Sequence, residues 1–287
     1  MTRASTRKQG FAGSSSGGMP VVTGEWTSPD PTLGGMVDDF RDKCIRVYKE
    51  DPNRVEEDAG KERGIAEGGY GRKQIQELVQ NAADALQGLA GRVQVRLTND
   101  ALYVANEGRP FEKLGVRALL YTHLSNKSGT EIGRFGLGFK SISGISDSPQ
   151  IFSRSVSFRF SREKAAETLR DEVGYQYERA DVPALRLAWL LNATSEFRED
   201  AMLRDLASWA TTVIKVPLKA GAEKQLSEEM KEFDESFNLF APHVRILDLV
   251  DAVAGRARQF KAARSGNRVT LTTEEGDRDW LVVSTDH

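Results

Sequence analysis

The feature that most constrains the fold is residues 72–87, where apolar and polar side chains follow each other with helical spacing. One apolar stripe is formed by Ile75, Leu78, Val79, Ala82 and Leu86. Glu77 and Asn81 are one turn apart, which separates them by only about 40° around the helix axis. The segment therefore predicts a helix that packs on a core with one side and presents a carboxylate and a carboxamide together on another.

The segments around this helix predict an α+β fold. Residues 92–97 alternate strictly, and residues 102–105 follow a turn at Asn99-Asp100, which is typical of a strand hairpin. Further strands are predicted at 150–160, 211–218, 268–273 and 279–284, and further helices at 36–49, 54–67, 112–122, 139–144, 197–209 and 222–240. This order favours a sheet layered with helices over alternating βαβ units.

Composition and patterning divide the chain into three parts. Residues 1–35 are rich in Gly, Ser, Thr and Pro, which predicts a disordered tail. Residues 36–218 are predicted to form one domain that contains the motifs described below. The pattern changes after Pro217, and residues 219–287 look like a C-terminal extension or the start of a following domain. The chain is then expected to be one end of a longer protein.

The overall charge and the cysteine count argue against several classes of protein. Lys plus Arg number 40 and Asp plus Glu number 42, and this balance argues against a dedicated nucleic-acid surface. Cys44 is the single cysteine, so no internal disulfide can form, and it is expected to be buried. No stretch approaches the ~20 apolar residues of a membrane helix. We expect a soluble, cytoplasmic protein without a zinc site.

The pair Glu77 and Asn81 can support metal-assisted hydrolysis. The Asn81 amide oxygen can ligate Mg²⁺, which favours oxygen ligands and keeps waters beside them. Glu77 can orient one such water as a general base. The same Glu-x-x-x-Asn spacing is also typical of an ordinary solvated helix face, so this motif alone does not decide the function.

A second motif closes the strand at 102–105. Asn106 has a side-chain oxygen that can accept a hydrogen bond from an adenine amino group, and Gly108 allows the backbone to approach the ring closely. A plain turn would have the same residues. Thr212 begins an alternating strand at 211–218, and that spacing predicts its hydroxyl at a sheet end on the inward side.

The third motif is glycine-rich and runs from Lys127 to Ser141. Gly133, Gly136 and Gly138 precede a helical run, where backbone N–H groups can bind phosphate oxygens. The segment also contains Lys127 and Lys140, which are candidate phosphate partners. The spacing is neither that of a Walker A loop nor that of a dinucleotide fingerprint, and a glycine hinge or lid is the alternative.

Together these motifs resemble the GHKL ATPases, a superfamily named after gyrase, heat-shock protein 90, histidine kinase and MutL. Residues 77–85 (Glu-Leu-Val-Gln-Asn-Ala-Ala-Asp-Ala) resemble its N-box, Asn106–Pro110 its first glycine box, Gly133–Lys140 its second and the Thr212 strand its closing threonine strand. The likeness covers roughly residues 54–218 and is greatest to sacsin-like and heat-shock-protein-90-like ATP-binding domains.

The resemblance implies a Bergerat-type α/β sandwich with helices on one face, and ATP and Mg²⁺ as ligands. Glu77 would activate water, and Asn81 would ligate the metal. The other implied nucleotide contacts are Asp84, Ala85, Asn106, Gly108, Lys127, Ser128, Gly133, Phe135, Gly136, Leu137, Gly138, Phe139, Lys140 and Thr212.

The sequence departs from the family pattern at the adenine position. Asn106 stands where the family usually has aspartate, and exchanging a charge-assisted hydrogen bond for a neutral one costs ~1 kcal/mol. Glu107 could supply the carboxylate instead if the register shifts by one. Pro110 replaces the last glycine of that box and stiffens the loop.

The first hypothesis is Mg²⁺-dependent ATP binding and slow hydrolysis that couple lid closure to conformational change or dimerisation of a larger chaperone-like or remodelling machine, whose protein client is unknown. Alternatives are a nucleotide sensor that does not hydrolyse ATP, and the ATPase module of a DNA-remodelling or defence system. No histidine precedes His123, which argues against a histidine kinase that phosphorylates itself on an upstream helix.

Overall fold

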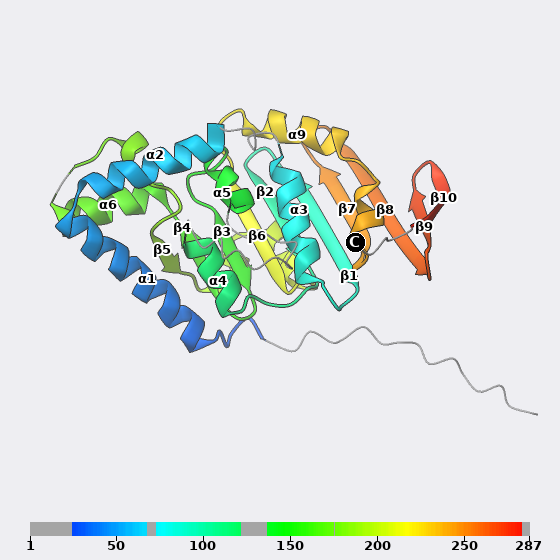
Figure 1. Ribbon diagram of the computed structural model, residues 1–287, viewed down its shortest axis with the longest axis horizontal. Helices are drawn as coiled ribbons and strands as arrows, with labels where there is room; N and C mark the ends of the chain where they lie inside the picture. The colour runs from blue at the N-terminus through cyan, green and yellow to red at the C-terminus, as the bar shows by residue number, and fades with distance from the viewer. Residues whose placement is uncertain (1–24, 68–72, 122–136, 175, 283–287) are drawn as a thin grey trace, which may run out of the picture.

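The computed structural model describes residues 25–67, 73–121, 137–174 and 176–282. Within them a single open sheet contains ten strands in the order β10-β9-β8-β7-β1-β2-β6-β3-β4-β5 (Figure 1). Strand β1 is parallel to β7, and the other neighbouring pairs of this sheet are antiparallel. The predicted α+β class with a mixed, mainly antiparallel sheet is confirmed.

The element boundaries agree with most of the predicted segments. The strands are β1 (Gly91–Leu97), β2 (Ala101–Asn106), β3 (Gln150–Ser153), β4 (Ser157–Phe160), β5 (Ala188–Leu190), β6 (Thr212–Pro217), β7 (Val244–Asp251), β8 (Arg256–Ser265), β9 (Arg268–Thr273) and β10 (Gly276–Leu281). The α-helices are α1 (Pro31–Glu50), α2 (Asn53–Glu67), α3 (Gln74–Ala85), α4 (Lys113–Leu120), α5 (Leu137–Lys140), α6 (Arg162–Val173), α7 (Ala193–Glu199), α8 (Ala201–Ala207), α9 (Ala222–Glu232) and α10 (Phe237–Phe240), with 3₁₀ turns at Ser141–Gly144 and Arg179–Asp181.

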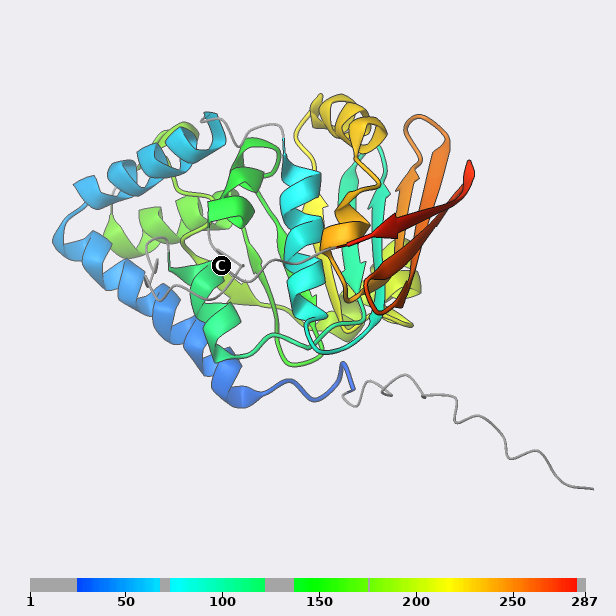
Figure 2. The ribbon, with the colours of Figure 1, turned by 45° about the vertical axis from the view of Figure 1, so that its right-hand side comes forward.

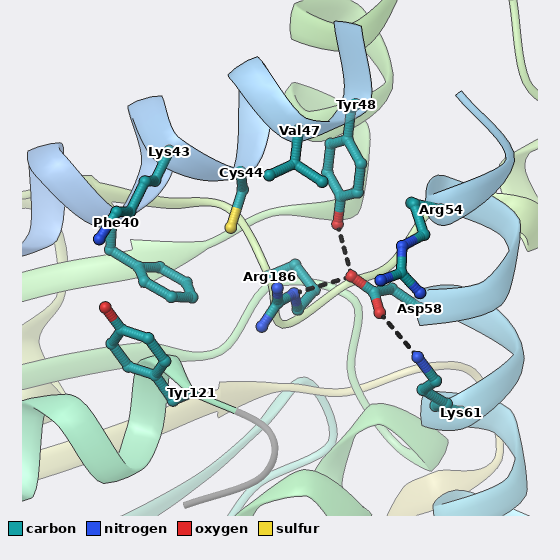
Figure 3. A pocket seen from close by; sticks show the side chains of 10 residues that line it. All are labelled: Phe40, Lys43, Cys44, Val47, Tyr48, Arg54, Asp58, Lys61, Tyr121 and Arg186. Atoms are coloured by element: carbon teal, nitrogen blue, oxygen red, sulfur yellow. Dashed lines mark hydrogen bonds and ion pairs between the residues drawn. The ribbon is translucent and has the colours of Figure 1, made fainter. Parts of the chain in front are cut away.

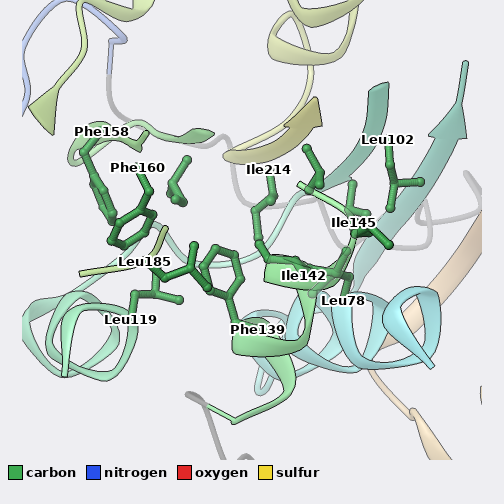
Figure 4. Close-up of a cluster of buried hydrophobic side chains, with 14 of the residues drawn as sticks. Leu78, Leu102, Leu119, Phe139, Ile142, Ile145, Phe158, Phe160, Leu185 and Ile214 are labelled. Carbon is green, nitrogen blue, oxygen red and sulfur yellow. The ribbon is translucent and has the colours of Figure 1, made fainter. Parts of the chain in front are cut away.

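The main core lies between the sheet and helices α1 to α6 and α9. In β2, Leu102 and Val104 point into this core, as expected for every second residue of a strand. Figure 4 shows the same layer around Phe139, with Phe160 from β4 and Ile214 from β6 close by. This layer supports helix α3, whose apolar side is part of the same cluster.

Helices also cover the opposite face of the sheet, which differs from the expected arrangement with helices on one face. Ala105 and Val213 point to this second face, where they pack with Leu203 and Leu206 of α8. Two short helices, α7 and α8, therefore provide a second, smaller apolar layer. The sequence contained this signal, because the spacing of Leu203 and Leu206 gives α8 an apolar side.

The predicted boundaries of the tail and of the domain need correction. Helix α1 begins at Pro31, after Asp30 accepts a hydrogen bond from the Thr32 amide, so the predicted tail of residues 1–35 overlaps a helix by five residues. At the other boundary, the sheet is continuous across residue 218, because β7 pairs in parallel with β1. Figures 1 and 2 show β7 and β8 beside β1, with α9 near the upper end of α3.

Two further predictions can be compared with the described residues. Cys44 is buried, as expected. None of the helices described is both long and apolar enough to cross a membrane.

Candidate functional site

Helix α3 has the two sides that its sequence predicts. Ile75, Leu78 and Val79 are buried in the main core, whereas Glu77 and Asn81 are only partly buried. Among the described residues, neither the Glu77 carboxylate nor the Asn81 carboxamide has a hydrogen-bond partner. Both polar groups are thus left available to bind something that is not part of the described chain.

The C-terminal end of α3 packs directly on the turn after β2. A Cβ atom added to Gly108 would lie 2.5 Å from the carbonyl oxygen of Ala85, a distance that side chains do not adopt. The next amide, Arg109 N, donates to the same oxygen at 2.8 Å. Glycine at position 108 therefore permits the close approach of the β2 turn to α3, whereas the sequence analysis had assigned this glycine to close approach of the adenine ring.

The structure brings Asn106 and Thr212 together at one end of the sheet. They are register partners in β2 and β6, and both are buried. Asn106 Oδ1 accepts from Gly108 N at 2.9 Å, which shapes the turn. The alternation of β2 and β6 directs both side chains to the face that α3 covers. Thr212 thus has the inward position that was predicted for it.

Ser153 in β3 joins these parts, and the sequence analysis did not identify it. The Ser153 hydroxyl accepts from the Phe111 amide at 3.0 Å and lies 3.3 Å from the Thr212 hydroxyl. It connects the turn after β2 to the first residue of β6. The available signal was the short Ser153-Arg154-Ser155 stretch between two strand-like runs, which is typical of a tight turn.

Two carboxylates near the site have different surroundings. Glu107 Oε2 accepts from Arg92 N at 2.8 Å, so its side chain is directed to the start of β1 rather than to the place proposed for adenine. In α3, Asp84 Oδ1 accepts from Gln80, but Asp84 Oδ2 is buried without a partner among the described residues. Burial raises the pKa of Asp84, and the Gln80 hydrogen bond opposes this shift. Asp84 therefore offers an unused acceptor.

The glycine-rich motif is described only in part. Lys127, Ser128, Gly133, Phe135 and Gly136 lie outside the described residues. Leu137 and Gly138 belong to α5, the short helix that packs against α3.

Lys140 and Phe139 are in the protein core rather than at a phosphate site. The Lys140 ammonium group is completely buried and donates to the carbonyl oxygens of Leu119 at 2.9 Å and Leu185 at 3.1 Å. Burial lowers the Lys140 pKa to about 8, and the Glu62 carboxylate opposes this shift. The prediction that Lys140 contacts phosphate is corrected accordingly, because its ammonium group is fully buried and two of its N–H groups donate to backbone carbonyl oxygens.

Two surface pockets lie away from α3's polar side. A pocket of about 420 Å³ lies between α1 and α2, and Figure 3 shows Asp58 at its centre. Asp58 accepts from the Tyr48 hydroxyl at 2.9 Å and pairs with Arg186 at 3.0 Å and Lys61 at 3.4 Å. A second pocket of about 650 Å³ has Gln74 and Lys219 in its wall. Neither wall contains Glu77, Asn81, Asn106 or Thr212.

A metal ion at α3 would need ligands beyond the His, Cys, Asp and Glu side chains of the described residues. Within the described residues, no group of three or more His, Cys, Asp or Glu side chains could hold a metal ion. Magnesium bound through Asn81, phosphate oxygens and waters does not require such a group.

No protein-family model matches the chain, and a search of the curated proteins finds no match either. The residues of α3 and the geometry around them are therefore the basis for assigning a function.

Proposed function

We propose that this chain binds ATP with Mg²⁺ beside α3 and hydrolyses it slowly, in the manner of the GHKL ATPases that its motifs resemble. One observation carries the proposal. The Glu77–Asn81 side of α3 has no partner among the described residues, while its C-terminal end packs on the turn that contains Asn106 and Gly108. Motifs that are far apart in the sequence thus meet around one helix.

The reacting end of the nucleotide is assigned to the polar side of α3. The Asn81 amide oxygen would ligate Mg²⁺, which neutralises phosphate charge when it is bound. Glu77 would hold the attacking water and take its proton as the bond to the terminal phosphate breaks. The partial burial of both side chains supports this role, because a carboxylate shielded from bulk water interacts more strongly with nearby charges.

The base end is assigned to the β2 turn and the C-terminal half of α3. Asn106 Oδ1 already accepts from Gly108 N, but an amide oxygen can accept a second hydrogen bond, here from the adenine amino group. Asp84 Oδ2 is the buried acceptor without a partner among the described residues, which suits a donor on the adenine or ribose side. Thr212 lies beside Asn106 and would help to fix the base through a water.

Nucleotide binding would change the conformation of a larger assembly. We propose that ATP favours closure of the segment that contains the second glycine box, accompanied by homodimerisation. The protein partner or client is not identified by any residue pattern in this chain.

The deciding experiment compares the wild type with Glu77→Gln. The variant should bind ATP and Mg²⁺ with nearly unchanged affinity, while turnover falls by about 10²- to 10⁴-fold because the general base is lost. Binding is measured by titration calorimetry and turnover by phosphate release. The matched control is Glu56→Gln, which changes an exposed carboxylate on α2 and should leave both quantities unchanged.

The other outcomes distinguish the alternatives. ATP binding with equal phosphate release from wild type and Glu77→Gln would support the nucleotide sensor and refute hydrolysis through Glu77. Absence of ATP binding would refute the proposal. Salt-dependent retention of the protein on DNA would favour the DNA-remodelling alternative.

A further inference from the structure

The N-terminal end of α3 is capped by a side chain from a distant part of the chain. Lys73 at the N-cap position makes no side-chain cap hydrogen bond. Instead, Glu229 of α9 accepts through Oε1 from Ile75 N at 2.7 Å and from Gln76 N at 3.2 Å. Because the first amides of a helix have no partner within it, Glu229 supplies acceptors that the local sequence does not provide.

A second polar contact joins the same two helices. Gln225 of α9 donates through Nε2 to Gln74 Oε1 at 3.2 Å. Gln74 is the first residue of α3 and is buried. Two residues of α9 that are one turn apart, Gln225 and Glu229, therefore contact the first turn of α3. These contacts restrict both the position and the direction of that turn.

Helix α9 is in turn bound to β7 and β8. The Ser227 hydroxyl donates to Asp251 Oδ2 at 2.7 Å, and Arg256 pairs with the same carboxylate at 2.9 Å. Arg258 donates to the carbonyl oxygens of Met230 and Phe233 at 3.2 and 3.0 Å, near the C-terminal end of α9. These contacts fix the position of α9, and therefore of Glu229, relative to β7 and β8. Movement of β7 and β8 would therefore displace Glu229 and, with it, the first turn of α3.

Shielding the Glu229 carboxylate from water costs more free energy than capping a helix requires. Its Oε2 atom is buried and has no partner among the described residues. Burial raises the Glu229 pKa to about 7, although the amides of Gln76, Ile75 and Gln74 favour the charged form. A serine or aspartate at position 73 would cap the helix locally without burying a carboxylate.

We propose that Glu229 is a positioning residue for Glu77, and that it couples the β7–β8–α9 part of the chain to the reacting end of the site. Glu77 directly follows Gln76, one of the two residues whose amides Glu229 binds. Displacement of this first turn would redirect the Glu77 carboxylate while leaving the Asn106 end of the site in place. This inference rests on the hydrolysis proposed above.

The test uses the full chain with Glu229→Ala, Glu229→Gln and the control Glu228→Gln. Glu228 is the exposed neighbour of Glu229 and pairs with Lys231 at the surface. Glu229→Ala should lower kcat by about 10- to 100-fold while the Kd for ATP changes by less than about twofold, because a small misplacement affects the chemical step most. Glu229→Gln keeps an acceptor oxygen and should recover most of the lost turnover, and Glu228→Gln should behave as the wild type.

A double-mutant cycle separates positioning from general stabilisation. In the Glu77→Gln background, Glu229→Ala should cause little further loss in single-turnover rate, because a positioning residue acts through the group that it positions. If the two losses multiply in full, or if Glu229→Ala has the wild-type kcat, the positioning role is overturned even though hydrolysis stands.

Hydrogen exchange reports the cap without any need for activity. Glu229→Ala should accelerate exchange at the Ile75 and Gln76 amides, and Glu228→Gln should not. Unchanged exchange would overturn the cap itself. If the wild type hydrolyses no ATP, the proposed function and the positioning role both fail, and faster exchange in Glu229→Ala would then assign Glu229 to structure alone.

Discussion

The two ends of α3 are held in different ways. At the C-terminal end, Gly108 allows the backbone of the β2 turn to touch Ala85, a contact between residues 23 positions apart in the chain. At the N-terminal end, Glu229 reaches the Ile75 amide from 154 positions away. The first contact combines close backbone packing with the hydrogen bond from Arg109 N to the Ala85 carbonyl oxygen, and no ionisable group takes part in it. The second contact depends on the Glu229 carboxylate, which is partly buried and can titrate. One end of the site is therefore fixed by backbone packing and the other by a titratable side chain.

The largest expected effect comes from adding one methyl group at the steric end. Gly108→Ala places a Cβ atom 2.5 Å from the Ala85 carbonyl oxygen, and the backbone must shift. We expect a loss of about 3 kcal/mol in the free energy of unfolding, measured by urea denaturation, together with weaker ATP binding.

The control for this change is Gly35→Ala in α1. A Cβ at Gly35 meets no atom within 4 Å, so this variant should be neutral or gain up to about 1 kcal/mol from helix propensity. A Gly108→Ala protein as stable as the wild type would contradict the steric account of this end of α3.

An intermediate effect is expected from pH at the polar end. Burial raises the Glu229 pKa from the ordinary value of 4.5 to about 7, so between these values the folded state binds more protons than the unfolded state. Its contribution to stability therefore falls as pH rises through this window, on the order of 1–3 kcal/mol in total. Glu229→Gln removes this titration and should lose less stability between pH 5 and 7.5.

The measurement is urea denaturation of both proteins at several pH values within that window. Asp84 and Glu62 also have raised pKa values, and both remain in the variant, so the difference between the two curves isolates Glu229. Parallel curves for the wild type and Glu229→Gln would show that Glu229 has the same pKa in the folded and the unfolded protein. Neither end of α3 would then depend on pH.

The smallest effect is expected from a single hydroxyl near the C-terminal end. Thr212→Val removes the hydroxyl that lies 3.3 Å from Ser153 Oγ and should cost about 1 kcal/mol of stability. Its neighbour Thr211 has a buried hydroxyl without a partner among the described residues, so Thr211→Val should be neutral or slightly stabilising. Thermal denaturation can measure the stability of both variants. Equal losses of stability would indicate that the hydrogen bond between Thr212 and Ser153 does not stabilise this end of the site.

The sequence predicted the structure correctly where apolar residues repeat with a regular period. The 3.6-residue spacing of Ile75, Leu78 and Val79 predicted both sides of α3, and alternation placed Thr212 on the inward face of β6. It was wrong about Lys140, because a glycine-rich segment does not reveal that the following lysine points into the core. Its charge and its place at the end of the glycine-rich motif had suggested a phosphate partner.

Four elements were missed, although one of them, β7, has a mostly apolar run from Val244 to Val250 that is typical of a strand. Strands β5, β7 and β8 and helix α6 were not predicted. On the face of β8 that contains the buried Phe260, the alternating positions hold Arg256 and Arg258, which hydrogen-bond to α9, so an apolar alternation is absent. Helix α6 buries little more than Ala165 and Leu169 among its apolar residues and has a weak apolar side. Such elements are stabilised by their neighbours rather than by their own pattern.

The amino-acid sequence by itself determined the α+β class, the two sides of α3 and the inward position of Thr212. These features follow from periodicity and local sterics, which act over a few residues. Only the tertiary structure decided that β7 joins β1, that Lys140 is enclosed, and that Glu229 caps α3. Those contacts join residues far apart in the chain, and their energies depend on burial, which the folded protein creates as a whole.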